Sequence, residues 1–546
     1  MTRLISIVAA ALLAGAPANG RPVVVGAEHD IAGFNTALSC CDDQWASWMG
    51  AEEALRGAFT QAPNGRWQNE LVSAASANAA GVTYTIKANA TWYWGGRKVP
   101  VTYRDFVYTL QQVDDPNNQV ADRSGYANLD PTRYRHTGEK RVTFFWKTTN
   151  CTADFPCGRY GNWQSLFSSL YPSFALRGMN FNTMWTSCIC GNDGKPVADG
   201  PYYVARYARG AGSVLEVNPF WAGARPSIRE IDFKVLSGTA SEVQAVQAHQ
   251  VDLVVPTFGS YLSQVKNAAG FTFSEIPGYE GEHLEFRVGT GASNALLRAP
   301  FIRQAIALAT DRTSIVGAVY GDLAAGIPAT NDALYFPTEA GYAPDFKQWS
   351  FDPKKALALM ARHCTGGPTS VDPASTAIWQ CSGLPATFNW TWPAGDTVGA
   401  VTEAVVKAEL RAIGIQIVDH PVAANLFYGS TGIASGDYDI AEFVETAGGD
   451  PGDWYDTYRC GGPVNFTGFC SRKVDALLAA GARETDPSRR TRDYQAADKA
   501  LATAVPALPL YQRPAVLLRR ATLAGVVDNA GPAGPFWNVE RWRWGR

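Results

Sequence analysis

Two segments with a strand–helix–strand pattern, residues 230–255 and 386–418, lie far apart in this chain. A strand that returns to its own sheet through a helix lies parallel to the strand before it, and such crossovers are almost always right-handed. Helices must then cover the faces of the parallel sheet, so each unit requires an α/β layer around it. Two units this far apart predict two α/β lobes.

The residues within each unit support this prediction. Ile231, Phe233 and Val235 alternate on one face of the first strand, and Gly414 ends the helix of the second unit. The first unit is expected to contain the strand 230–236, the helix 240–249 and the strand 252–255, and the second to contain the strand 386–390, the helix 397–412 and the strand 415–418.

The length and composition indicate a globular chain with more than one core. It has 546 residues, of which 46% are hydrophobic and 18% are charged. A separate α+β subdomain is predicted around residues 80–150, with strands at 82–87 and 141–147 and a helix at 103–112. The net charge of −3 gives no reason to expect nucleic acid or an anionic membrane as a partner.

The N-terminus predicts export. Arg3 is a minimal positive region, Leu4 to Ala14 form a short apolar run, and Ala16-Pro17-Ala18 supplies the small residues that precede a signal-peptidase cleavage site. The run is well short of the roughly 20 residues that span a bilayer. Ala16 stands where a lipoprotein would carry its lipidated Cys, so a soluble exported protein is expected. The alternative is an uncleaved N-terminal helix.

Cysteine usage agrees with export, because three pairs lie close together in Gly-, Pro- and Asn-rich loops where a short bridge is easy to form. The predicted bridges are Cys151 with Cys157, Cys364 with Cys381, and Cys460 with Cys470. The other four, Cys40, Cys41, Cys188 and Cys190, are expected to pair across space. Their spacing is not the Cys-x-x-Cys of zinc knuckles, so no metal site is expected.

Several blocks in a fixed order carry a family resemblance. The most specific is Pro300 to Arg312, with Phe301-Ile302-Arg303-Gln304-Ala305 and Ala309-Thr310-Asp311-Arg312. The others are Phe34-Asn35, Trp94-Gly95 with Pro100 to Tyr108, Asp199 to Tyr202, Asn218 to Gly223, Tyr438 to Ile440 with Asp450-Pro451, Val474 to Leu478, and Pro506 to Tyr511. From about residue 22 to residue 525 the chain resembles the extracellular solute-binding proteins, family 5, which serve oligopeptide, dipeptide and nickel importers.

The resemblance implies an α/β, two-lobed periplasmic-binding-protein fold, with hinge strands near residues 285–288 and 509–512 and an extra α+β subdomain inserted in lobe I. The implied division is a signal peptide at 1–20, lobe Ia at 21–45, 195–285 and 513–546, subdomain Ib at 46–194, and lobe II at 286–512. A ligand held between two such lobes is desolvated when the hinge closes.

The implied function is that of the solute-binding component of an ABC transporter, which captures a peptide-like or other small solute and delivers it to the membrane permease. The protein would be monomeric and periplasmic or associated with the cell surface, with no enzymatic activity, cofactor or metal. The alternative is an exported, carbohydrate-active hydrolase. Gly-x-Ser-x-Gly and His-Glu-x-x-His are absent from the sequence, whereas a catalytic carboxylate pair stays open.

Nine residues are predicted to hold the solute: Phe34, Asn35, Trp390, Trp392, Glu442, Glu445, Asp450, Trp454 and Tyr455. The two tryptophans end a strand at its carboxyl side, where α/β lobes place ligand contacts, and core packing is their alternative role. Glu442 and Glu445 lie in an apolar strand, where an unpaired carboxylate is costly, so each would meet a ligand ammonium or an arginine of the other lobe. Asp450 could instead cap the turn before Pro451.

The chain departs from the peptide-binding members of this family at two points. Ala447 stands where those members have an Asp that pairs with the peptide amino terminus, and no Arg stands beside Trp392. Recognition of peptide termini therefore stays open, and so do an oligosaccharide stacked on tryptophan and a metal chelate.

Overall fold

The computed structural model describes residues 20–41, 43–151, 157–236, 238–256, 260–423, 427, 432–446, 450–462, 464–529, 531 and 533–545. Residues 1–19 of the predicted signal peptide and Ala447 lie outside the described residues. Among the helices in the described part of the chain, none combines the length and the apolar character that crossing a membrane requires.

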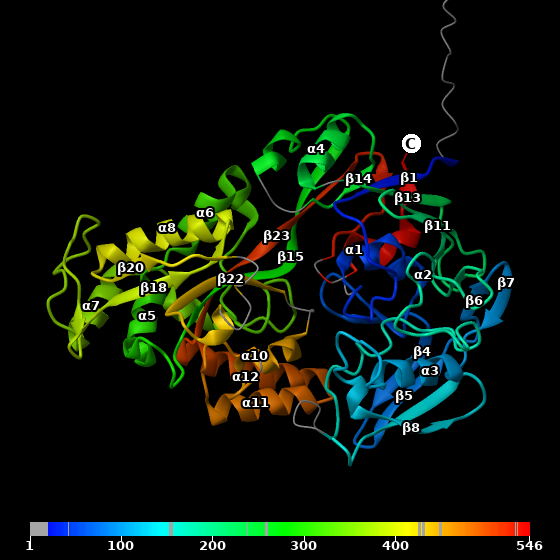
Figure 1. The fold of residues 1–546 in the computed structure, drawn as a ribbon, viewed down its shortest axis with the longest axis horizontal. Coiled ribbons are helices and arrows are strands. Elements are labelled where there is room, and N and C mark those ends of the chain that lie inside the picture. Colours follow the sequence, from blue (N-terminus) through cyan, green and yellow to red (C-terminus); the bar gives the residue numbers. More distant parts are fainter. Residues whose placement is uncertain are drawn as a thin grey trace, which may run out of the picture.

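One ten-stranded sheet runs through the molecule, with the strand order β11-β12-β13-β1-β14-β23-β15-β22-β18-β20. Its strands are β1 (Val23–Ala27), β11 (Tyr202–Ala208), β12 (Gly212–Val217), β13 (Glu230–Val235), β14 (Leu253–Val254), β15 (Phe271–Phe286), β18 (Thr387–Thr391), β20 (Gln416–Asp419), β22 (Ile440–Thr446) and β23 (Ala507–Arg520). We call the half that contains β1 the first lobe and the half that contains β18 the second lobe (Figure 1).

Both predicted crossover units are confirmed, one in each lobe. In the first lobe β1 pairs in parallel with β13 and with β14, and helix α4 (Thr239–Gln247) connects those two strands. In the second lobe β18 pairs in parallel with β20, and α8 (Thr397–Ala412) makes the connection. Asp396 caps α8 by accepting a hydrogen bond from the backbone N–H of Val398.

The two long strands β15 and β23 join the lobes as an antiparallel pair (Figure 1). Their pairing is interrupted in the middle: Pro277 lies opposite Pro514, and the next pair is Gly281 with Gln512. Three residues of β15 therefore face one residue of β23, and neither proline can donate a ladder hydrogen bond. On β23 the interruption borders Gln512, which belongs to the predicted hinge range 509–512. On β15 it lies N-terminal to Glu285, where the predicted range 285–288 begins.

Buried arginines tie the family-like block of the second lobe to its neighbours. Helices α5 (Pro300–Ala309) and α6 (Arg312–Tyr320) are separated by a short break at which Asp311 caps α6. Arg303 donates to the carbonyl oxygens of Ala504 and Val505 at the end of α12 (Pro487–Ala504). Arg312 donates to the carbonyl oxygen of Pro509 on β23. The Arg303 bonds satisfy carbonyl groups that the end of α12 leaves without partners, and the Arg312 bond ties α6 to β23.

The remaining helices of the second lobe begin as the sequence predicts. Asp352 caps α7 (Pro353–His363) and Asp486 caps α12, with proline at the first helical position in both. Beside α12 lies α11 (Arg472–Arg483), and both helices lie to the left of the strand-rich part of the chain in Figure 1.

The strand-rich stretch forms a sheet of its own with the order β4-β5-β9-β8. Its strands are β4 (Val72–Ala77), β5 (Gly81–Ile86), β8 (Leu129–His136) and β9 (Arg141–Trp146), and α3 (Tyr103–Asp114) packs beside it. Thr102 and Asp105 form a capping box at the start of α3, which fixes where this helix begins. The predicted strands and helix of this stretch are therefore confirmed.

The ten cysteines form five disulfides. The three predicted bridges, Cys151–Cys157, Cys364–Cys381 and Cys460–Cys470, are confirmed. The expectation that the other four pair across space is wrong, because Cys40 bonds to Cys41 and Cys188 bonds to Cys190. Each of these cysteines has its partner within two residues of the chain, so local geometry decides the pairing.

Two of the three confirmed bridges close loops of different length and provide a test of how loop length affects the free energy of unfolding. Replacing both Cys364 and Cys381 with Ala should lower the free energy of unfolding by about 3 kcal/mol, and the same change at Cys151 and Cys157 by about 2 kcal/mol, because the shorter loop restricts the unfolded chain less. Thermal unfolding of both double variants beside the parent chain measures the difference. A greater loss from the shorter loop would contradict this explanation.

Candidate functional site

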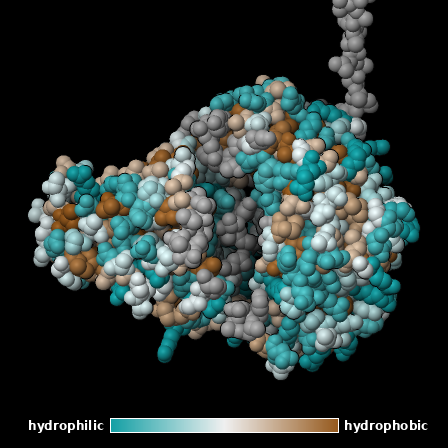
Figure 2. Space-filling view, in the orientation of Figure 1, coloured by the Kyte–Doolittle hydropathy of each residue, from teal (hydrophilic) through white to brown (hydrophobic). Residues whose placement is uncertain are grey.

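A pocket of about 180 Å³ lies where the two lobes meet the hinge strands. In the space-filling view the molecule is hollowed between its two halves (Figure 2). The first lobe and the C-terminal segment contribute Glu28, Gln44, Trp45, Trp48, Val255, Pro256, Asn529, Gly531, Gly534 and Pro535 to the lining. The hinge strands contribute Pro277, Gly278, Glu280, Arg513, Pro514 and Ala515, and the second lobe contributes Tyr320 and Val398. Both lobes therefore form the walls of one pocket, and the interrupted strands form its floor.

A short helical segment positions the aromatic wall of this pocket. Asp43 caps α1 (Gln44–Ala46) and accepts hydrogen bonds from the backbone N–H groups of Trp45 at 2.7 Å and Ala46 at 3.2 Å. The indole rings of Trp45 and Trp48 meet edge to face with centroids 5.1 Å apart. Trp48 also packs against Phe536 of the C-terminal segment. These contacts thus hold both indoles in place at the wall of the pocket.

Charge is concentrated on the floor of the pocket. Arg513 donates from Nε to Glu282 at 2.6 Å and lies 3.8 Å from the carboxylate of Glu280. Burial alone would lower the pKa of Arg513, but Glu282 raises it above its ordinary value. Burial raises the pKa of Glu280, which Arg513 opposes. The guanidinium is already matched by Glu282, so Glu280 and Glu28 give the pocket an acidic lining.

Phe34 and Asn35 are core residues of the first lobe. Phe34 is fully buried and contacts the ring of Tyr207 edge to face at 5.2 Å. The side-chain amide of Asn35 donates to the carbonyl oxygen of Phe181 and accepts from the hydroxyl of Tyr171. These hydrogen bonds hold the segment after β1 against residues 171–181.

Trp390, Trp392 and Glu442 lie together in the core of the second lobe. Trp390 is fully buried, and Trp392 packs against Gly399 in the first turn of α8, where a Cβ would lie 2.8 Å from the indole and 2.5 Å from a Glu442 oxygen. Glu442 is fully buried, and neither of its carboxylate oxygens has a hydrogen-bond partner among the described residues. Burial, with the charge of Glu282, raises the pKa of Glu442 well above its ordinary value, which favours the neutral form of this carboxyl.

Asp450, Trp454 and Tyr455 lie on the side of the second lobe that faces the strand-rich sheet. Asp450 forms a two-pronged ion pair with Arg490 and also accepts from the backbone N–H of Gly452 at 2.7 Å, so it does cap the turn after Pro451. Trp454 is largely buried. Tyr455 lines a second pocket of about 330 Å³ between this lobe and the strand-rich part.

A backbone hydrogen bond joins the strand-rich part to the second lobe beside this second pocket. The N–H of Gly161 donates to the carbonyl oxygen of Ala482 on α11 at 2.6 Å. A Cβ at Gly161 would lie 2.7 Å from the carbonyl oxygens of Glu484 and Gly481, so a larger residue would push the two parts away from each other. The lobes therefore touch on the side of the cleft opposite the hinge strands.

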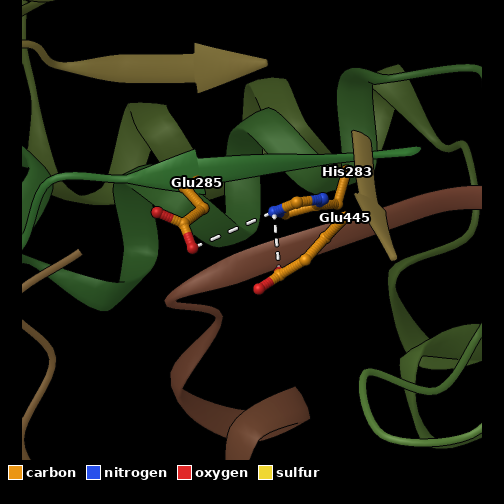
Figure 3. A group of neighbouring side chains, drawn as sticks. All are labelled: His283, Glu285 and Glu445. Carbon is orange, nitrogen blue, oxygen red and sulfur yellow. Dashed lines mark ion pairs between the residues drawn. The ribbon is translucent and has the colours of Figure 1, made fainter. Parts of the chain in front are cut away.

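Glu445 is brought together with two residues that the sequence analysis missed, His283 and Glu285 of β15 (Figure 3). The Nε2 atom of His283 lies 3.7 Å from a Glu445 oxygen and 3.9 Å from a Glu285 oxygen. Burial raises the pKa of Glu445 to about 7, which the His283 charge opposes. Burial alone would lower the pKa of His283, but the two carboxylates raise it. The His-x-Glu alternation on one strand is the sequence signal that could have revealed this group.

None of the nine predicted residues is among those that line the 180 Å³ pocket. The lining residues Trp45, Trp48, Glu280 and Arg513 were missed. The spacing of Trp45 and Trp48 on a helical segment was a signal, and so was the charge of Arg513 directly after the predicted hinge residue Gln512. Their approach depends on contacts between distant segments, which local patterns do not encode.

Comparisons with known proteins agree with this architecture. The sequence profile of the bacterial extracellular solute-binding proteins, family 5, matches residues 67–466. An oligopeptide-binding protein OppA of Mycobacterium tuberculosis is 24% identical over 455 residues, which is 81% of this chain and 71% of OppA. A di/tripeptide-binding protein 3 of Pseudomonas aeruginosa is 24% identical over 327 residues, 58% of this chain and 56% of that protein.

Solved structures with the same two-lobed fold cover nearly the whole chain. The periplasmic EDTA-binding protein EppA has a TM-score of 0.78 at 18% identity, covering 97% of this chain and 98% of EppA. AppA of Bacillus subtilis, in complex with a nonapeptide, has a TM-score of 0.68 at 18% identity, covering 97% and 100%. The expected two-lobed α/β fold and the resemblance are thus confirmed. This chain belongs to the bacterial extracellular solute-binding proteins, family 5.

Proposed function

We propose that this member of the family delivers a short, peptide-like solute to an ABC permease and recognises an ammonium group of that solute in the pocket at the hinge. The observation that carries the proposal is the composition of this pocket: Glu28 and Glu280 supply negative charge, while Trp45, Trp48 and Tyr320 supply aromatic surface. A solute ammonium is attracted both to carboxylates and to the faces of aromatic rings.

The position of the pocket supports capture by closure. Its walls come from both lobes, so a bound solute contacts both at once and favours the closed arrangement over the open one. Movement at the interruption between Pro277 and Gly281 needs few backbone dihedrals to change, since the ladder is already broken there. The permease would then distinguish the loaded, closed protein from the empty, open one.

The size of the pocket favours a short solute. Its volume of about 180 Å³ is below the roughly 300–1,000 Å³ of pockets that hold drug-sized ligands. The printed names of relatives, which include an oligopeptide-binding and a di/tripeptide-binding protein, support a peptide. The EDTA-binding neighbour and a neighbour in complex with Ni(L-His) make a metal chelate the second candidate. An oligosaccharide on Trp45 and Trp48 is the third.

The remaining parts of the proposal concern the whole protein. Residues 1–20 would direct export, and the mature chain would act as a periplasmic or cell-surface-associated monomer that performs no chemistry on its solute. The proposed parts are lobe Ia, subdomain Ib and lobe II with the limits expected from the sequence. The nine predicted residues would act mainly as supports of the cleft walls, with Tyr455 at the second pocket.

A ligand panel tests the class of solute. The purified protein, unfolded and refolded to remove any co-purified ligand, should be stabilised by a di- or tripeptide in thermal unfolding, following mass action with about 2.7 kcal/mol at a concentration one hundred times the dissociation constant. The same peptide acetylated at its amino terminus should stabilise less. Stabilisation only by an oligosaccharide or a chelate would contradict the peptide proposal, and turnover of a panel member would contradict the transport function.

The role of Glu280 can be tested in a thermodynamic cycle that combines a change in the protein with a change in the ligand. Glu280→Gln should weaken binding of the free peptide about tenfold, because a charged hydrogen bond is lost, and should leave the acetylated peptide nearly unaffected. Isothermal titration calorimetry measures all four combinations. Glu139→Gln, at an exposed carboxylate outside the pocket, is the matched control.

The pH dependence of binding provides a second readout of the same residue. The pKa of Glu280 is raised by burial, so its carboxylate takes up a proton at a pH above the ordinary value of 4.5 and then no longer attracts an ammonium. Affinity for the free peptide should therefore fall as the pH decreases through this range, and Glu280→Gln should flatten the decrease. An equal loss of both peptides in Glu280→Gln would show that this residue does not face the ammonium.

A further inference from the structure

His283, Glu285 and Glu445 lie on one face of two paired strands of the second lobe. β15 and β22 are antiparallel, with Gly281 opposite Glu445, His283 opposite Phe443 and Glu285 opposite Ala441. Residues opposite one another share a face of the sheet, so the three side chains point to the same side and Phe443 lies between them. Glu442 and Glu282 point to the other face. Strand alternation thus separates this group from the ion pair of Arg513.

The three side chains converge on one point (Figure 3). His283 Nε2, one Glu285 oxygen and one Glu445 oxygen all lie within 4.8 Å of one another. The distances of 3.7 and 3.9 Å from Nε2 to the carboxylates exceed hydrogen-bond length, and Nε2 has no hydrogen-bond partner among the described residues. Two ligands about 2.0–2.1 Å from a tetrahedral cation lie about 3.4 Å apart, so the three ligand atoms, which lie within 4.8 Å of one another, would have to approach by up to about 1.4 Å to complete such a site.

The tautomer of His283 and the orientation of both carboxylates suit metal ligation. Nδ1 of His283 lies 3.5 Å from the carbonyl oxygen of Gly281, which favours the tautomer with its lone pair on Nε2. The hydroxyl of Tyr438 donates to the far oxygen of Glu285 at 3.3 Å, and the hydroxyl of Thr457 donates to the far oxygen of Glu445 at 3.2 Å. Outer hydrogen bonds of this kind hold ligating groups in place at metal sites.

The charges of His283, Glu285 and Glu445 also suit metal ligation. The His283 and Glu285 side chains are 10% and 1% exposed, and Glu445 is 24% exposed. No lysine or arginine in the described part of the chain forms an ion pair with either carboxylate. The buried carboxylates of Glu282 and Asp450, by contrast, each have an arginine partner. His283 is thus the one possible cationic partner of Glu285 and Glu445 among the described residues, and a divalent cation that displaces the protons of this group would neutralise both carboxylates.

We propose that His283, Glu285 and Glu445 form a binding site for one divalent transition-metal ion of the Zn²⁺ type. One imidazole nitrogen and two carboxylate oxygens suit Zn²⁺ and the neighbouring ions Co²⁺ and Ni²⁺ better than Ca²⁺ or Mg²⁺, which prefer more numerous oxygen ligands. The partial exposure of Glu445 leaves one coordination position reachable by water. The ion would link β15 to β22 at a place separate from the solute pocket, since none of its three ligands lines that pocket.

The experiment uses the full mature chain without a polyhistidine tag, passed over a chelating resin so that no free chelator reaches the solute cleft. Titration with Zn²⁺ alone in a calorimeter should give one ion per chain. Co²⁺ alone should give visible absorption of a four- or five-coordinate ion without a thiolate band, because all cysteines of the described chain are in disulfides. Ca²⁺ and Mg²⁺ should give neither signal.

Two variants separate this site from any other metal binding. Glu445→Gln and His283→Gln should each weaken Zn²⁺ binding by about 100-fold or more, since losing a direct ligand costs at least as much as losing an outer-shell partner. Glu442→Gln is the matched control, because it makes the same change on the same strand but on the opposite face, and Zn²⁺ affinity should be retained. Circular dichroism reports whether each variant folds, and Glu285→Gln replaces any that does not.

Two results would overturn the proposal. One is the absence of stoichiometric Zn²⁺ and Co²⁺ binding by the parent chain, which would leave the three residues as an ion-pair cluster around a protonated histidine. The other is binding that stays the same in Glu445→Gln and His283→Gln, which would place the ion elsewhere.

Discussion

The pairing of β15 with β23 is the interaction on which the rest of the structure depends. These strands belong to one sheet that continues from the first lobe into the second, so the lobes share backbone hydrogen bonds rather than a flexible linker. The pairing is interrupted where Pro277 and Pro514 meet, and the side chains beside this point, Glu280 and Arg513, form the floor of the pocket. In the proposed function, hinge and binding surface are therefore one place, so solute contacts would be coupled directly to closure.

The buried charged groups of the second lobe and the strands beside it are accommodated in four ways. Arg303 and Arg312 donate to backbone carbonyl groups, one at the end of α12 and one on β23. Glu282 and Asp450 each pair with an arginine. Burial raises the pKa of Glu442 and so favours its neutral form. Glu445, only three residues along the same strand, meets His283 and Glu285 instead. One strand thus carries two acids with different chemistry, because alternation turns them to opposite faces of the sheet.

Much of the fold could be predicted from the sequence. Both crossover units, the capped starts of α7 and α12, the strands and helix of the strand-rich stretch, and three disulfides were all expected. The reason is that helix caps, alternation and short loops are local features. The pairing of Cys40 with Cys41 and of Cys188 with Cys190 was not expected. Bonds between cysteines this close require particular backbone geometry, and the sequence does not reveal that geometry.

The sequence by itself determined the class of fold, the order of its elements and the family, because these follow from hydrophobic period, turn residues and a series of ordered motifs. Only the tertiary structure decided which polar residues meet. Trp45 and Arg513 are far apart in the chain, and so are His283 and Glu445, yet each pair lies at one site because strand register and lobe contacts place them there. The physical reason is that burial and charge pairing depend on neighbours from distant segments. The sequence alone does not show what surrounds a carboxylate of an apolar strand on the face of the sheet to which it points.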